Sequence, residues 1–183
     1  MALIPSLPER SFLADVYQRF PKTLKPLLEY HDILLRGESP LSVAQREMIA
    51  AYVSGLNACN YCFGAHKALA AAFDVDPELF DQLLNDLDNA PIDEKFKPIL
   101  RYVRKLTQTP SKMTQADADA ITQAGWDDQA MFDAISVCAL FNFMNRIIEG
   151  TGVEPQTEEE RPSKESLKDR TYMDWGRSIG VFE

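Results

Sequence analysis

Two cysteines, a histidine and a glutamate are spaced so that together they could carry out thiol redox chemistry. Cys59, Cys62 and His66 form a C-x2-C-x3-H run, and Glu47 stands twelve residues before the first cysteine. On the first turn of a helix, a C-x2-C pair places two sulfurs within disulfide reach while one stays exposed to a substrate. His66, four residues after Cys62, falls one turn further along the same helix face.

A cysteine becomes a nucleophile only as its thiolate. An unperturbed thiol has a pKa of about 8.5, so only a few per cent is ionised at neutral pH. A helix N-terminus contributes roughly 0.3–1 kcal/mol, whereas lowering the pKa by two units needs about 2.7 kcal/mol. A base must therefore supplement the helix dipole, and His66 and Glu47 are the candidates.

Glu47 can take part only if the chain reverses between it and His66. In one unbroken helix the two residues would lie about 28 Å apart at 1.5 Å per residue, too far for proton transfer. Gly55-Leu56-Asn57 provides a break, because glycine suits a helix end and Asn57 suits the N-cap of the next helix. We predict two antiparallel helices that set Glu47 opposite His66 in a carboxylate, imidazole and thiol relay.

Other sites use the same residue types. A zinc site could take both cysteines and His66, but it lacks a convincing fourth ligand unless His31 or Glu47 closes the shell. Covalent haem attachment needs a histidine directly after the second cysteine, where this chain has Phe63. The simplest alternative is a pair of cysteines that pack as small hydrophobes. We favour redox chemistry by the cysteine pair and expect neither a metal nor a cofactor.

The polar or reactive residues outside this run are weaker candidates for a functional site. His31, on an amphipathic stretch, is expected at the surface or at an interface. Cys138 lies in an apolar stretch and is expected to pack in the core. Asn142, Asn145 and Arg146 follow on the same stretch. Either they cap backbone groups or pair across an interface, or one of them lines the substrate pocket.

Composition excludes several classes of function. The 183 residues, 45% of them hydrophobic, suit one domain with a sizeable core. The net charge of −9 repels phosphate backbones and anionic membranes, so nucleic acid is not an expected partner. With no run of 18 apolar residues and no signal-like N-terminus, we expect no membrane anchor and a cytoplasmic location. Three cysteines do not make a disulfide framework.

The segments that must position the candidate residues all have helical patterns, and no alternating strand pattern occurs. Apolar spacing and capping signals predict an all-α fold of about eight helices. They span residues 12–20, 23–36, 42–56, 58–73, 76–87, 93–107, 114–125 and 127–148. Ser42 and Gln45 form a capping box before Glu47, and Pro98 should confine its helix to the later residues.

The composition changes near the C-terminus. Residues 1–153 form the predicted helical domain, including an N-terminal arm, and residues 154–183 form a C-terminal arm. The arm begins with an acidic, proline-broken stretch and continues with large apolar residues such as Tyr172, Met173 and Trp175. A disordered tail rarely carries so many large apolar groups. We expect the arm to dock on its own body or on a neighbouring subunit.

The pattern E-x11-C-x2-C-x3-H of Glu47, Cys59, Cys62 and His66 resembles the alkylhydroperoxidase D-like (AhpD-like) family of the carboxymuconolactone decarboxylase superfamily. The runs 54–57 and 139–146 resemble its peroxidase-related branch, and the likeness covers about residues 8–153. The resemblance implies an AhpD-like helical bundle, commonly assembled into trimers or hexamers, that reduces hydroperoxides without haem or metal. We expect a homo-oligomer: a dimer, trimer or hexamer.

The resemblance also implies individual roles. Cys62 would be the peroxidatic cysteine that becomes a sulfenic acid, Cys59 the resolving cysteine and proton donor, and His66 and Glu47 the proton relay. Dipole reasoning alone favours the cysteine nearer the helix start, Cys59, as the more reactive. The family's peroxidases hold a second histidine directly before the second cysteine. This chain has Tyr61 there, which can donate a hydrogen bond in the pocket but is no base at neutral pH.

Three functions are compatible with these residues. The favoured one is a thiol-dependent peroxidase whose cysteine pair is restored by an external dithiol, such as a lipoyl- or thioredoxin-like protein. The second is a lactone decarboxylase of the same superfamily, in which His66 and Glu47 move protons. The third is a non-enzymatic oligomer that senses redox state or binds a partner, its disulfide controlling assembly.

Overall fold

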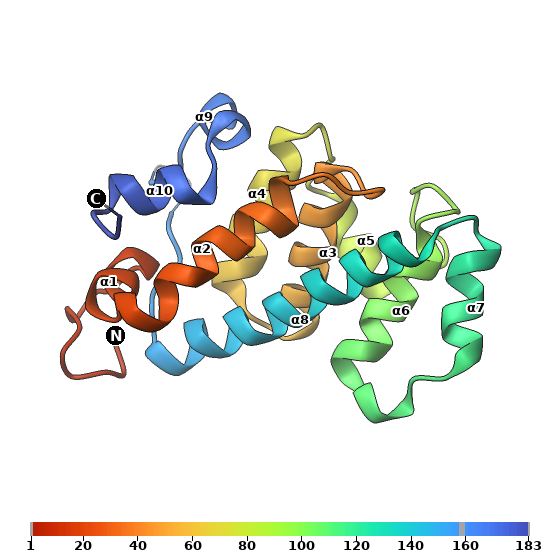
Figure 1. Ribbon diagram of the computed structural model, residues 1–183, viewed down its shortest axis with the longest axis horizontal. Helices are drawn as coiled ribbons and strands as arrows, with labels where there is room; N and C mark the ends of the chain where they lie inside the picture. Colours follow the sequence, from red (N-terminus) through yellow and green to blue (C-terminus); the bar gives the residue numbers. More distant parts are fainter. Residues whose placement is uncertain (1, 158–159, 183) are drawn as a thin grey trace.

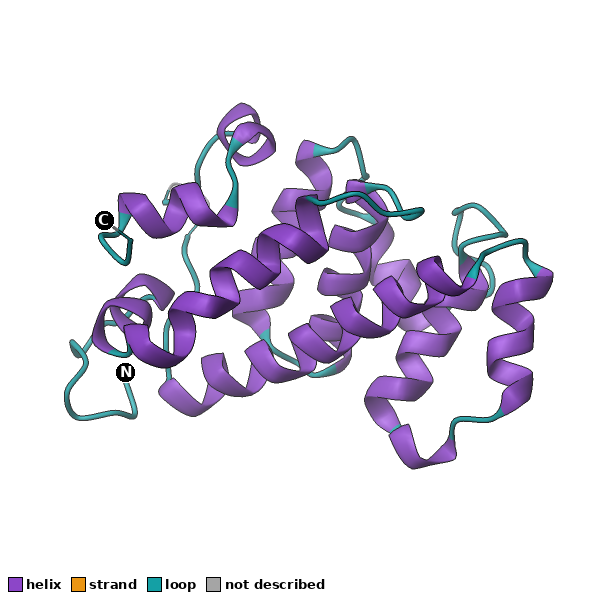
Figure 2. Cartoon of the chain, viewed as in Figure 1, coloured by secondary structure: helices purple, strands orange, loops and turns teal. Residues whose placement is uncertain are grey.

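The structure, a computed structural model, describes residues 2–157 and 160–182. Throughout these residues the regular secondary structure is helical, as predicted, and no strand occurs (Figure 2). They contain ten α-helices rather than about eight. The two additional helices lie in the C-terminal arm, where the side chains of Ser163 and Thr171 cap helices of six and seven residues. The sequence pattern predicted a docking arm in this region but no helix within it.

The eight predicted helices are present, and their ends lie within about one helical turn of the predicted ones. In chain order the helices are α1 (Leu13–Arg19), α2 (Pro21–Arg36), α3 (Val43–Leu56), α4 (Asn60–Ala72), α5 (Leu79–Asn85), α6 (Lys97–Gln108), α7 (Gln115–Gln123), α8 (Asp128–Thr151), α9 (Lys164–Asp169) and α10 (Tyr172–Ser178). A 3-10 turn, Pro110–Lys112, joins α6 to α7.

The centre of the molecule is built on α3, which packs against α4, α6 and α8. Figure 1 shows α8 running along the length of the molecule beside α2, with α5, α6 and α7 at one end and α1, α9 and α10 at the other. Every residue of α3 from Arg46 to Ser54 is buried, including Glu47. The predicted capping box fixes the start of this helix, because Ser42 and Gln45 exchange hydrogen bonds of 2.9 and 3.2 Å.

The chain reverses between α3 and α4, as the distance argument requires. Ala58, between the two helices, has a φ of 54°, a left-handed conformation that residues other than glycine seldom adopt. Gly55, one of the residues expected to make the break, is still part of α3. A Cβ at Gly55 would lie 2.9 Å from Leu84 Cδ1, so this glycine permits close packing against α5 while Ala58 makes the turn.

Asn57 does not cap α4, contrary to the prediction, because Cys59 occupies the N-cap position. The Asn57 side chain instead donates hydrogen bonds to the side-chain oxygens of Asn142, at 3.2 Å, and Asn145, at 2.8 Å. These bonds tie the reversal to α8. A polar residue in a turn can form hydrogen bonds to a neighbouring helix instead of capping the helix that follows it. The local sequence cannot distinguish these two sets of hydrogen bonds.

The C-terminus of α2 is held against α3 by a buried arginine. Arg46 of α3 donates hydrogen bonds of 2.9 Å to the carbonyl oxygens of Leu34 and Gly37, which α2 itself leaves without partners. This contact fixes where the last residue of α2, Arg36, lies relative to Glu47.

The C-terminal arm folds back over its own chain, with α10 against α2 and α9 against α4 (Figure 1). The Asp32 carboxylate accepts hydrogen bonds from the backbone N–H groups of Tyr172, at 2.6 Å, and Met173, at 2.9 Å. An acidic side chain at the first N–H groups of a helix satisfies donors that have no partner within the helix. Two glutamates of the acidic stretch, Glu158 and Glu159, lie outside the described residues.

A glycine allows α10 to pack closely on α2. A Cβ at Gly176 would lie 2.5 Å from the Phe182 ring and 2.7 Å from Leu28 Cδ1. The Trp175 ring meets the Tyr17 ring edge-on, with 5.4 Å between centroids. These contacts hold α10 against α2 and against Tyr17 of α1.

One helix of the described chain, α8, is long and apolar enough to span a membrane by length and composition. In the most apolar stretch of 18 residues of α8, 56% is buried within the protein, which is typical of a core helix. Cys138 on this helix is fully buried, as predicted.

Candidate active site

Cys59 and Cys62 lie at the start of α4, the first as its N-cap residue and the second in its first turn. Both thiols are free and hydrogen-bonded to each other. Cys59 has no exposed surface, whereas Cys62 is 4% exposed and lines a cavity. A molecule in that cavity would therefore meet the sulfur of Cys62 and not that of Cys59.

The shared hydrogen bond separates the acidities of the two thiols. The pKa of Cys59 is lowered, chiefly because its sulfur accepts the hydrogen bond from the Cys62 thiol; burial opposes the shift, and the Cys62 backbone N–H supports it. The pKa of Cys62 is raised, because its thiol donates that bond and because it is buried. The first proton to leave the pair thus produces a Cys59 thiolate held by the Cys62 thiol.

Glu47 lies opposite His66, which confirms the predicted antiparallel arrangement. Glu47 Oε2 is 2.6 Å from His66 Nδ1, and its Oε1 accepts a 2.5 Å hydrogen bond from Arg36 Nη1. Burial alone would raise the pKa of Glu47, but His66 and Arg36 outweigh it and lower the pKa below its ordinary value. Glu47 is therefore a carboxylate that accepts from Nδ1–H, which leaves His66 Nε2 free to exchange a proton.

Arg36 is a site residue that sequence reasoning missed. It stands in the last turn of a different helix, and its guanidinium also lies over the rings of Phe73 and Tyr172. Basic residues are common at helix C-termini, so only the packing of α2 on α3 shows that this one neutralises a buried carboxylate.

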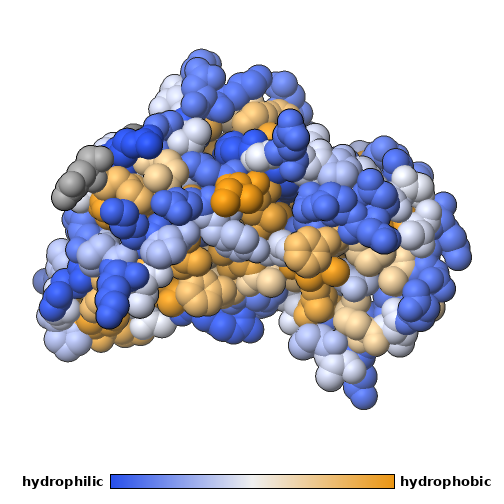
Figure 3. Space-filling view, viewed as in Figure 1, coloured by the Kyte–Doolittle hydropathy of each residue, from blue (hydrophilic) through white to orange (hydrophobic). Residues whose placement is uncertain are grey.

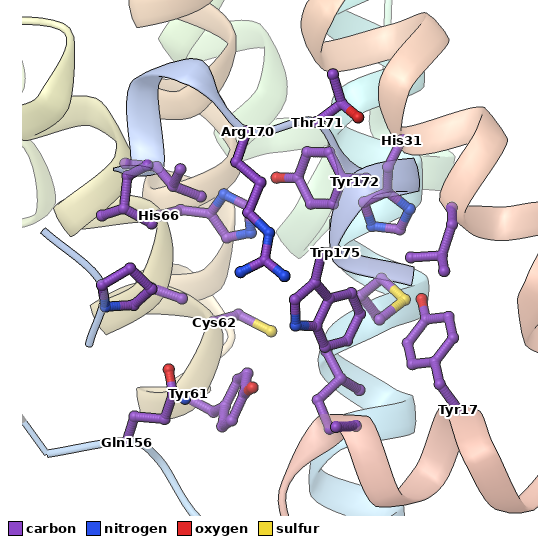
Figure 4. A pocket seen from close by; sticks show the side chains of 18 of the residues that line it. Tyr17, His31, Tyr61, Cys62, His66, Gln156, Arg170, Thr171, Tyr172 and Trp175 are labelled. Atoms are coloured by element: carbon purple, nitrogen blue, oxygen red, sulfur yellow. The ribbon is translucent and has the colours of Figure 1, made fainter. Parts of the chain in front are cut away.

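A cavity of about 270 Å³ opens above Cys62 and His66 (Figure 4). Its walls come from α1, α2, α4 and α8 and from the C-terminal arm, and most of its lining side chains are apolar. About a third of the lining residues belong to the arm: Gln156, Pro162, Leu167, Arg170, Thr171, Tyr172 and Trp175. Sequence reasoning named none of these as site residues, although the aromatic residues of the arm were the signal that it docks.

His31 lines the same cavity, so the expected surface or interface position is wrong. The side chain is 3% exposed, and its Nδ1 donates a 2.6 Å hydrogen bond to the Leu27 carbonyl oxygen. Burial lowers the pKa of His31 to about 4, so the imidazole is neutral at neutral pH. The periodicity of α2 could not reveal this burial, because the cover is Tyr172, whose ring centroid lies 4.9 Å from that of His31.

Of the three candidate pocket residues, only Tyr61 lines the cavity. Burial raises the pKa of Tyr61 above its ordinary value, so its hydroxyl stays protonated. Asn145 is buried and donates a 3.0 Å hydrogen bond to Ser54 Oγ, while Asn142 donates one of the same length to the Cys138 carbonyl oxygen. Asn145 therefore joins α8 to α3, whereas Asn142 meets the turn through the hydrogen bond that it accepts from Asn57.

A zinc site would have to use both cysteines and His66, with His31 or Glu47 as the fourth ligand. Over residues 2–157 and 160–182, no three His, Cys, Asp or Glu side chains are grouped so as to hold a metal ion. Both oxygens of Glu47 are engaged by His66 and Arg36, so a zinc shell closed by Glu47 would have to displace those hydrogen bonds.

Known proteins resemble this chain in sequence and in fold. Residues 21–88, which include Glu47, both cysteines and His66, match the Carboxymuconolactone decarboxylase family. A peroxidase-related protein from Silicibacter sp. TM1040 is 30% identical, covers 83% of this chain and 79% of its own, and superposes with a TM-score of 0.75. The chain is an AhpD-like member of the carboxymuconolactone decarboxylase superfamily.

Two further structures show how widely this AhpD-like fold is used. An AhpD core protein from Ralstonia eutropha JMP134, also called peroxidase-related, is 26% identical over 78% of this chain and 75% of its own, with a TM-score of 0.73. A debrominase bound to 2,3,4-tribromopyrrole is 12% identical over 85% of this chain and 80% of its own, with a TM-score of 0.67. No curated protein matches the sequence. The family match and the two peroxidase-related proteins indicate an enzyme, but the reaction must be argued from the site.

Proposed function

We propose that this AhpD-like protein is a thiol-dependent peroxidase that reduces hydroperoxides with its Cys59 and Cys62 pair. The observation that carries the proposal is the position of Cys62: its thiol lines the cavity, is hydrogen-bonded to a second buried thiol, and lies one turn from His66. His66 is in turn held by a carboxylate with no exposed surface. Nucleophile, base and orienting group thus follow in order.

In the proposed first step, the His66 imidazole takes one proton from the cysteine pair, and Glu47 stabilises the imidazolium. The remaining proton passes along the hydrogen bond from Cys62 to Cys59. The Cys62 thiolate then attacks the outer oxygen of the hydroperoxide, so that an S–O bond forms and the O–O bond breaks. The departing alkoxide takes the proton from Cys59, which yields an alcohol, a Cys62 sulfenic acid and a Cys59 thiolate.

In the second step the Cys59 thiolate attacks the sulfur of the sulfenic acid. The S–S bond forms, hydroxide leaves, and the His66 imidazolium protonates it to water. An external dithiol then reduces the disulfide, with a lipoyl- or thioredoxin-like protein as the proposed donor. The cycle converts one hydroperoxide and two thiols to an alcohol, water and a disulfide, and the cysteine pair is its only redox group.

Thiol counting with cumene hydroperoxide tests this proposal. One equivalent should consume two of the three thiols of the native chain, and a dithiol should sustain turnover. Cys62→Ser should lose at least a hundredfold in turnover, while Cys59→Ser should stop at a sulfenic acid that dimedone traps. Cys138→Ser, which changes a buried thiol outside the cavity, should behave like the native chain. Undiminished turnover by Cys62→Ser would refute the proposal.

A further inference from the structure

The cavity is much larger than hydrogen peroxide requires. Its volume of about 270 Å³ is near the lower end of the roughly 300–1,000 Å³ typical of small-molecule sites, whereas one water occupies only about 30 Å³. Aromatic and aliphatic side chains dominate the lining, among them Phe141, Met144, Leu167 and Trp175. A compact organic molecule would fill this space and displace poorly held water from apolar walls.

The charges that line the cavity are all basic. Among the described lining residues there is no aspartate or glutamate, although the chain as a whole carries a net charge of −9. The guanidinium of Arg36 is neutralised by Glu47 at 2.5 Å. Arg170 is the other arginine of the lining, and no carboxylate in the described part of the chain forms an ion pair with it.

The Arg170 side chain points from the arm into the cavity, between His66, Cys62 and Trp175 (Figure 4). One guanidinium nitrogen donates to Ser178 Oγ, which anchors the group and leaves its other N–H groups available. A guanidinium beside apolar walls binds a carboxylate through two parallel hydrogen bonds.

We propose that the substrate is a compact, carboxylate-bearing organic hydroperoxide, with the C-terminal arm supplying the residue that recognises its charge. This inference rests on the proposed peroxidase function. The hydroperoxide group meets Cys62 and His66, the apolar body packs against Trp175 and the aliphatic walls, and the carboxylate binds Arg170. Arg170 is thus a specificity residue: it binds the carboxylate of the substrate and takes no part in the thiol chemistry.

Matched substrates separate recognition of the charge from reactivity. The probes are cumene hydroperoxide carrying a para carboxylate and the methyl ester of the same compound, which is neutral and similar in shape. The native chain should turn over the carboxylate with a kcat/KM about tenfold higher than the ester, as one charge-assisted pair predicts. In Arg170→Gln the ratio should fall to about one, mainly through a higher KM for the carboxylate, and Arg170→Lys should retain part of it.

Arg177→Gln is the matched control, because Arg177 lies on the same arm but pairs with Asp174 outside the cavity. It should keep the full preference. Equal kcat/KM values for the two probes in the native chain, or a preference that survives Arg170→Gln, would overturn the inference and leave the peroxidase function intact. An equal loss for both probes in Arg170→Gln would likewise overturn it, since Arg170 would then serve the reacting thiol.

Calorimetry with the product, para-(2-hydroxypropan-2-yl)benzoate, separates this inference from the peroxidase function. If neither hydroperoxide is turned over, the peroxidase function fails. Product binding that weakens about tenfold in Arg170→Gln, and not in Arg177→Gln, would still support a carboxylate site on the arm. Absence of product binding to the native chain would overturn the site as well.

Discussion

At the residue scale, Glu47 is the group on which the site depends. It is a buried carboxylate whose two oxygens are shared between a histidine that lines the cavity and an arginine from another helix. It sets the tautomer of His66 and neutralises Arg36, so one side chain affects both the proposed reaction and the stability of the fold. Removing one partner of a buried ion pair costs far more than the pair contributes in total, because a charge is left uncompensated.

Glu47→Gln should therefore lower the free energy of unfolding by about 3–5 kcal/mol, the range for a broken buried pair. The rate of sulfenic acid formation should fall as well, because the imidazolium of His66 loses its stabilising carboxylate. Urea unfolding and single-turnover kinetics with cumene hydroperoxide measure the two effects. Glu38→Gln, at an exposed position, is the control and should change stability by less than about 0.5 kcal/mol. A Glu47→Gln protein as stable as the native chain would contradict the role given to the pair.

His31 should make stability depend on pH. Its pKa is lowered from 6.5 to about 4 in the folded protein, so between these values the unfolded chain binds a proton that the folded chain does not. The contribution is complete above about pH 6.5 and lost as the pH falls towards 4, on the order of 3 kcal/mol in total.

The measurement is an NMR titration of the His31 ring together with unfolding curves between pH 4 and 7. His31→Gln removes one of the two histidine signals, which assigns the other, and should flatten the pH dependence across this window. A His31 midpoint near 6.5 would show that the imidazole is not held neutral by burial.

At the element scale, the cavity exists because short helices of the arm pack on α2 and α4. Asp32 holds the start of α10, and Gly176 lets that helix approach Leu28. The site therefore depends on helix contacts that lie outside it. α10 has only seven residues, too few for a stable isolated helix, so its stability must come from this packing.

Gly176→Ala should consequently lower the free energy of unfolding by about 1–3 kcal/mol, because the added methyl group overlaps Phe182 and Leu28. The matched control is Gly150→Ala in α8, where a Cβ has nothing within 4 Å. That substitution should raise stability by about 0.5–1 kcal/mol through helix propensity alone. Thermal unfolding of both variants tests the contrast, together with their KM for the para-carboxylated cumene hydroperoxide. Stabilisation of both variants would show that α10 does not pack closely on α2.

At the scale of the whole molecule, exposed apolar side chains gather on the helices α2 and α8. Of the large hydrophobic residues exposed in the described part, Tyr30 and Ile33 lie on α2, and Phe132 and Phe143 lie on α8. Figure 3 shows apolar surface along these two helices. Ile33 is 69% and Phe132 62% exposed, and side chains of this size seldom stay in water when they are grouped. We propose that this α2 and α8 face joins subunits of a homo-oligomer.

Light scattering behind gel filtration tests the oligomer. Ile33→Glu combined with Phe132→Glu should reduce the mass of the native assembly to that of smaller species, because charges would be buried at the interface. Leu3→Glu, at a residue that is also exposed but lies near the N-terminus, should leave the mass unchanged. A native chain that elutes as a monomer, or a double variant with the native mass, would contradict the proposed interface.

Much of the fold could be predicted because its signals are local. Apolar periodicity, the Ser42 capping box and Pro98 in the first turn of α6 each act within one helix, so eight of the ten described helices were foreseen. The reversal of the chain between α3 and α4 was predicted because Glu47 and His66 would be too far apart in one unbroken helix. Its details were not predicted, because Ala58 adopts a left-handed conformation for which alanine gives no sequence signal.

The sequence by itself determined the candidate set of Glu47, Cys59, Cys62 and His66, because residue type and helical spacing are enough to bring those groups together. Only the tertiary structure decided what surrounds them. Arg36 and Arg170 reach the site from helix and arm positions that carry no local pattern for it, and His31 is buried by a helix some 140 residues later in the chain. Contacts between distant segments depend on how complete faces pack, and such packing is a property of the folded chain rather than of any one stretch of sequence.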